Sequence, residues 1–75
     1  MHEIDLAVYA DALAGEFAAL SARAERIRSR LRQAKIERRE ERAAHAELRE
    51  LEDSLAALEE LQVWVEAELA ATNAA

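Results

Sequence analysis

Apolar residues recur in the first half of the chain at alternating intervals of four and three residues. The series runs through four heptads without a miss and comprises Leu6, Ala10, Leu13, Phe17, Leu20, Ala24, Ile27, Leu31 and Ala34. This spacing places the apolar side chains on one stripe of a helix and is typical of a coiled-coil seam, with Leu6 at a d position and Ala10 at an a position. It predicts a first helical arm over about residues 3–35.

A second apolar series has the same spacing, with one polar residue, Gln62, that the neighbouring Leu61 can cover. It comprises Ala44, Leu48, Leu51, Leu55, Leu58, Gln62, Val65 and Leu69. The series predicts a second helical arm over about residues 42–71, followed by a frayed tail at 72–75. The two seams do not join in phase, because Ala34 and Ala44 both take d positions and are ten residues apart. Either a stammer in one helix or a reversal of the chain explains this break.

Three features favour reversal. The two series have nearly equal length, so folding near Glu37–Arg38 sets one against the other over its whole extent. Bases four residues apart in the first arm repel one another in an isolated helix and need acids from elsewhere. Reversal supplies these acids, since it sets Arg23, Arg26, Arg28 and Arg30 opposite Glu47, Glu50, Glu52 and Asp53. We therefore predict an all-α fold, an antiparallel coiled-coil helical hairpin forming one domain over residues 1–75, with a turn at about 36–41.

Two other arrangements remain. Residues 30–52 contain no Gly, Pro, Asn, Asp or Thr, which favours one long continuous helix in a dimeric coiled coil. Such a helix would measure about 110 Å, whereas a hairpin would measure about 50 Å. Three shorter helices, with the later ones beginning at Ser21 or Asp53–Ser54, form the third and least favoured arrangement.

Several apolar residues lie outside both seams and would meet at the open end of the hairpin, near the two termini. They are Ile4, Val8, Tyr9, Val63 and Trp64. A lone two-helix hairpin covers only one stripe of each helix, so these residues call for a partner. Trp is also enriched at the energetic centres of interfaces. We expect a second copy to dock there, giving a homodimeric four-helix bundle with exposed tips, or another protein to bind the same residues.

Charge is distributed unevenly in this chain of net charge −6. Nine of the ten Lys and Arg residues lie within residues 23–42. A basic band of this kind favours an alternative function, a nucleic-acid-associated factor that contacts phosphates. In the hairpin, however, the acids of the second arm would neutralise the first part of this basic band. The basic residues near the turn would then remain as candidates for binding a charged partner. These candidates are Lys35, Arg38, Arg39 and Arg42.

Residues that could carry catalysis are scarce. The chain has no Cys, no Ser/His/Asp set and no Gly-rich phosphate loop, so we expect neither an enzyme nor a cofactor. Glu37, Glu41 and His45 recur at intervals of four and support a second alternative, a metal- or cofactor-holding helical bundle. A single His among exposed carboxylates is more often solvated than occupied.

The chain has no apolar run of the ~20 residues that a membrane helix needs. Its first ten residues also lack the basic segment of a signal peptide. We therefore expect a cytoplasmic protein that does not bind membranes. Because Ala, Leu, Glu and Arg dominate the composition, the expected function is that of a small structural coiled-coil protein: an adaptor, an assembly factor or a regulatory subunit.

Overall fold

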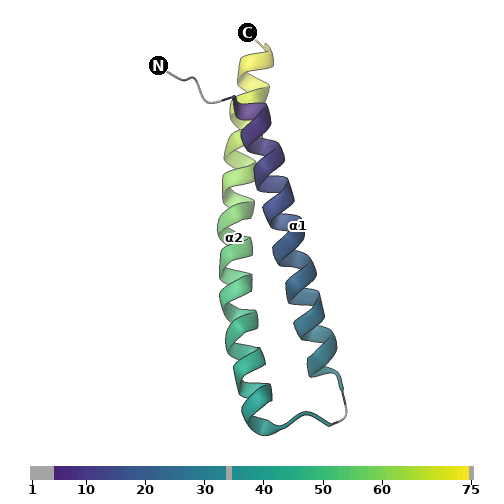
Figure 1. Cartoon of the computed structure of the whole chain (residues 1–75). Coiled ribbons are helices and arrows are strands. Elements are labelled where there is room, and N and C mark those ends of the chain that lie inside the picture. The colour runs from purple at the N-terminus through teal and green to yellow at the C-terminus, as the bar shows by residue number, and fades with distance from the viewer. Residues whose placement is uncertain (1–4, 34, 75) are drawn as a thin grey trace.

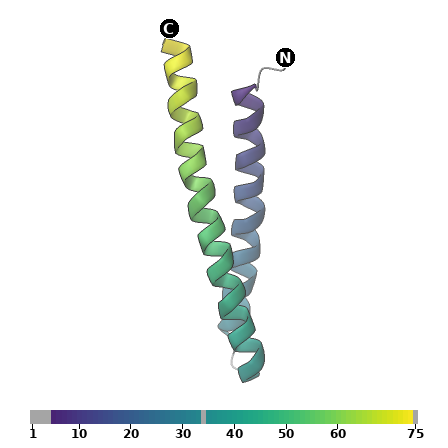
Figure 2. The same ribbon diagram turned by 90° about the vertical axis from the view of Figure 1, so that its left-hand side faces the viewer.

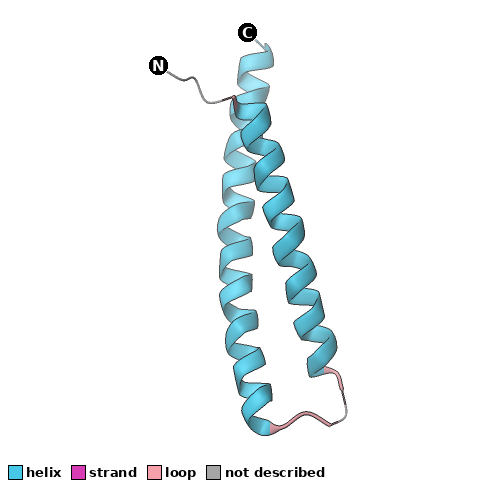
Figure 3. Cartoon of the chain, viewed as in Figure 1, coloured by secondary structure: helices cyan, strands magenta, loops and turns pink. Residues whose placement is uncertain are grey.

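The computed structural model describes residues 5–33 and 35–74, which form two α-helices packed side by side in opposite directions (Figure 1). Helix α1 spans Leu6–Leu31 and helix α2 spans Arg38–Ala74. The start of α1 and the end of α2 lie at one end of the hairpin, and the described loop residues lie at the other (Figure 3). The molecule measures 56 × 24 × 15 Å, close to the length expected for a hairpin. The predicted all-α helical hairpin is confirmed, and the continuous helix is excluded.

The axes of the two helices cross. In Figure 1 the ribbons overlap near the termini and separate toward the loop. After a quarter turn, in Figure 2, they overlap near the loop and separate toward the termini. A small crossing angle of this kind is the usual result of packing the side-chain ridges of one helix into the grooves of another.

The helix ends differ by a few residues from those expected. Helix α1 begins where Asp5 caps it, since the Asp5 carboxylate accepts a hydrogen bond of 3.0 Å from the Ala7 amide. It ends at Leu31 and not near residue 35, and the Arg32 amide donates to the Ser29 carbonyl in a tightened last turn. The described loop residues are therefore 32, 33 and 35–37.

Helix α2 begins four residues before the predicted start of the second arm. Its first turn contains Glu40 and Glu41, whose negative charges suit the positive end of the helix macrodipole. Helix α2 also continues through most of the predicted frayed tail. There the Thr72 hydroxyl donates a 2.9 Å hydrogen bond to the Glu68 carbonyl within the last turns.

The core is the seam that the apolar spacing predicts. Every a and d residue in the described part of the chain is buried or half-buried, including the polar Gln62. Four residues are buried: Leu13 and Ala24 in α1, and Leu51 and Val65 in α2. Ala24 is fully covered although its side chain is a single methyl group, so α2 packs directly against α1 at this residue. Ala34, the last residue of the first series, lies outside the described residues.

Gly15 lies on the outward side of α1, two residues after the buried Leu13. A Cβ atom added to Gly15 would meet no other atom within 4 Å. We therefore expect Gly15→Ala to raise the free energy of unfolding by about 0.5–1 kcal/mol, because Ala loses less backbone entropy in a helix. Urea denaturation followed by circular dichroism measures this change. A loss of stability would show that the outward face of α1 is covered at Gly15.

Candidate interaction surfaces

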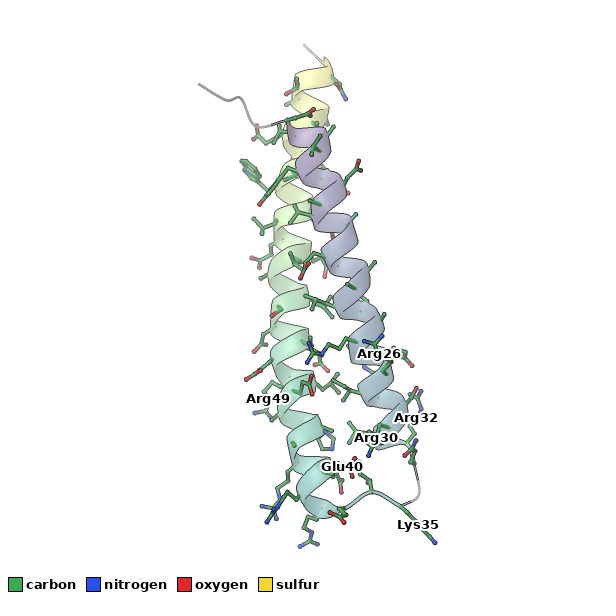
Figure 4. The ribbon with its side chains drawn as sticks, viewed as in Figure 1. Arg26, Arg30, Arg32, Lys35, Glu40 and Arg49 are labelled. Atoms are coloured by element: carbon green, nitrogen blue, oxygen red, sulfur yellow. The ribbon has the colours of Figure 1, made fainter. Side chains whose placement is uncertain are left out.

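Three ion pairs join the helices and define their register. Arg23 Nε donates to Glu47 Oε1 over 2.9 Å, and Arg30 pairs with Glu40 in the same way one heptad along (Figure 4). In both pairs the residues lie just before an a position, which is heptad position g. On the other side of the seam, Arg28 approaches Glu52 to 3.8 Å, and both residues lie just after a d position, which is position e. Such g-to-g and e-to-e pairs form when one helix is reversed relative to its neighbour.

The observed pairs agree only in part with the expected ones. Glu47 and Glu52 pair with α1 as expected, but Arg30 pairs with Glu40, and Arg26 makes no ion pair with any described residue. Glu50 and Asp53 do not pair with α1, because heptad positions c and f turn them away from it. The pairs that form are solvent-exposed, so each stabilises the fold by only about 0–1 kcal/mol and mainly selects the register.

The loop end exposes the predicted charged-partner residues. Lys35, Arg38, Arg39 and Arg42 are all exposed, and none forms an ion pair within the described part of the chain. In Figure 4 the side chain of Lys35 extends outward from the loop. These four side chains therefore present cationic groups to the solvent.

The possible metal ligands do not form a cluster. His45 Nε2 lies 3.9 Å from Glu41 Oε1, but Glu37 precedes the first turn of α2. Among the residues that the structure describes, no three His, Asp or Glu side chains come close enough together to hold a metal ion. No observation here favours the metal-holding alternative.

The open end exposes most of the apolar residues predicted to form an interface. Val8, Val63 and Trp64 are each more than half exposed, and Tyr9 is 37% exposed. Ile4 lies outside the described residues. Leu61, expected to cover Gln62, is 41% exposed and joins this exposed apolar set.

These exposed residues are divided among three faces. Tyr9 and Leu61 each lie two heptads from a member of the Arg23–Glu47 pair, so they occupy the same g side of the seam. Trp64 follows Leu61 by three residues and lies one turn away on that side of α2. We call Tyr9, Leu61 and Trp64 the aromatic patch.

Val8 and Val63 lie elsewhere on the molecule. Val63 lines a shallow depression with Ala56, Glu59 and Glu60 on the e side of α2. Val8 takes position f, on the outward side of α1. The predicted interface set therefore does not form one continuous surface.

The hairpin also separates charge along its length. Residues 23–49, the tip half, contain all ten Lys and Arg residues and five acids, for a net charge of +5. Residues 1–22 and 50–75, the open half, contain eleven acids and no Lys or Arg, for a net charge of −11. The fold brings residues 5–22 and 50–74, both acidic, to one end of the hairpin and places the basic segment at the opposite end.

Neither α1 nor α2, as far as the structure describes them, has a stretch apolar and long enough to cross a lipid bilayer. Comparison of the chain with protein-family models, with curated proteins and with solved structures found no match in any of the three, so no family assignment follows.

Proposed function

We propose that this chain is a small protein-interaction module, an adaptor or assembly subunit that acts as a homodimer. In the dimer two hairpins pack into a four-helix bundle. The observation that carries the proposal is the aromatic patch, three large side chains exposed beside a core in which four of the described residues are buried. Aromatic residues in such positions are typical of the centres of protein interfaces.

The exposed area of the hairpin supports self-association. Its accessible surface is 6143 Å², whereas a compact monomer of 8.4 kDa would expose about 4,600 Å². A standard interface buries about 800 Å² on each partner. A dimer of this size would remove about half of the excess, and each helix would gain a second neighbour, as in other four-helix bundles.

The loop end supports the adaptor role. Its four cationic side chains are exposed, one in the loop and three at the start of α2, and they offer a binding surface for an acidic segment of another protein. The three cross-helix ion pairs already engage Arg23, Arg28 and Arg30, which leaves less of the basic band for a nucleic-acid backbone. This distribution favours a protein partner.

Sedimentation equilibrium of the full chain, from micromolar to millimolar concentration, tests the proposal. We expect the mass to rise from 8.4 kDa toward twice that value as the concentration increases. A mass that stays at the monomer value over the whole range would contradict the proposed dimer. Tight binding of a DNA duplex at low salt would favour the nucleic-acid alternative.

A further inference from the structure

We infer that the second copy docks antiparallel on the side that carries the aromatic patch. The acidic open half of each hairpin then lies against the basic tip half of the other. The inference rests on the proposed dimer and adds to it an orientation, a register and a set of opposing residues.

Charge complementarity determines the orientation. Two hairpins joined only by their open ends, or aligned in parallel, would bring together two halves that each carry a net charge of −11. Antiparallel overlap instead brings each such half against one that carries +5. Helices in contact are about 8–10 Å apart, within the screening length of about 8–10 Å at moderate salt, so this difference is felt across the interface.

Helix α1 determines the register. Its charges change sign between Glu16 and Arg23, and the middle of this interval, near Ala19, also lies close to the middle of α1. A two-fold axis near Ala19 therefore aligns the two α1 helices along their whole length and pairs opposite charges. Ala19 is exposed at position c, on the side of the aromatic patch.

In this register Arg26 lies opposite Ala12 of the second copy, within one turn of the second copy's Tyr9. Arg26 is exposed on the half of α1 nearer the loop (Figure 4) and makes no ion pair with the described residues. It borders a shallow depression on the outer side of α1, together with Ser29 and Arg30. This depression gives room for the Tyr9 ring, on which a guanidinium group can stack.

The response of the dimer to salt tests the inference by its direction. We expect the dissociation constant measured by sedimentation equilibrium to rise about tenfold between 0.05 and 0.5 M NaCl, because salt screens the attraction between the halves. A dimer joined through its open ends would become tighter in salt, since screening relieves acid–acid repulsion. A dissociation constant that falls or stays constant with salt overturns the inference but leaves the dimer itself in place.

A pair of charge-reversed variants locates the contact. We expect Arg26→Glu to raise the dissociation constant about tenfold or more, because it sets an acid against the acidic open half. Arg39→Glu makes the same change of charge at heptad position f, on the outward side of α2 and away from the side of the aromatic patch, and should change the constant by less than about twofold. Equal effects of the two variants would overturn the proposed register.

A distance between the two loop ends tests the orientation directly. The chain has no Cys, so Gln33→Cys provides a single site for a nitroxide spin label. With the axis near Ala19, pulsed electron paramagnetic resonance should give about 42 Å, from 28 residues of helix at 1.5 Å each. Parallel docking would give about 20 Å, and open-end docking with the axis near Tyr9 would give about 72 Å, from 48 residues at about 1.5 Å each; either result overturns the inference. No measurable pair distance would refute the proposed dimer itself.

Discussion

Val65→Asp should unfold the hairpin. Val65 is fully buried at a d position, where its side chain packs between the helices. The substitution loses about 1.5–3 kcal/mol of apolar burial, and the buried carboxylate costs several kcal/mol more. A domain of 75 residues has a total stability of only about 4–11 kcal/mol, so the loss is comparable to the whole. Far-UV circular dichroism and thermal melting measure the loss of helix.

Val63→Asp is the matched control. Val63 lies two residues earlier in α2, carries the same side chain and is 62% exposed on the e side. The variant has the same composition and the same net charge as Val65→Asp. We expect its free energy of unfolding, taken from the melting curve, to stay within about 0.5 kcal/mol of that of the parent chain. Similar unfolding in both variants would contradict the burial of Val65 in the seam and the exposure of Val63 outside it.

Trp64→Ala should separate the dimer and leave each hairpin helical. Trp64 is 54% exposed in the single hairpin, so its removal takes little from the packing between α1 and α2. In the proposed dimer it would lie within the interface, where truncation of a buried hot-spot Trp costs about 2 kcal/mol or more, roughly a thirtyfold rise in the dissociation constant. Analytical ultracentrifugation measures the association, and circular dichroism measures the helix content.

Two further variants separate association from folding. Leu48→Ala removes a half-buried seam residue and should mainly lower the stability of the hairpin. For each unit of apolar area lost, it should weaken association less than Trp64→Ala does. Val8→Ala removes an exposed apolar residue from the outward face of α1 and should leave association unchanged. If Trp64→Ala associates as strongly as the parent chain, the aromatic patch does not lie in the interface.

The seams could be predicted from the sequence because burial of one helical stripe is a repeated requirement. Each apolar residue at an interval of three or four reinforces the same stripe, and one polar residue such as Gln62 does not hide it. The position of the loop could not be predicted as closely. Residues 30–52 are helix formers throughout, so no breaking residue marks where α1 ends. The break of phase between the seams indicated a reversal without locating it to the residue.

The sequence predicted which apolar residues would be exposed, but it did not predict that they lie on different faces of the hairpin. Exposed Tyr9 and Trp64 follow from their positions outside the seams, whereas the separation of Val63 from Trp64 depends on heptad position across the reversed helices. The same point explains the ion pairs. Residues directly opposite each other along the hairpin were expected to pair. In the structure, the g positions beside the seam pair across it at an offset along the helices, so Glu40 pairs with Arg30.

The separation of charge along the hairpin makes the molecule a strong electric dipole. The field of a dipole acts before any side chains touch, and it turns two approaching hairpins so that the tip half of one faces the open half of the other. Complementary fields of this kind act mainly on the rate of association, whereas the contacts that desolvate on binding, which in the proposed dimer would include Trp64, mainly set the lifetime of a complex. In the proposed dimer, the basic segment at the turn would therefore speed the correct mutual orientation of the two molecules, and the aromatic residues near the termini would hold them together.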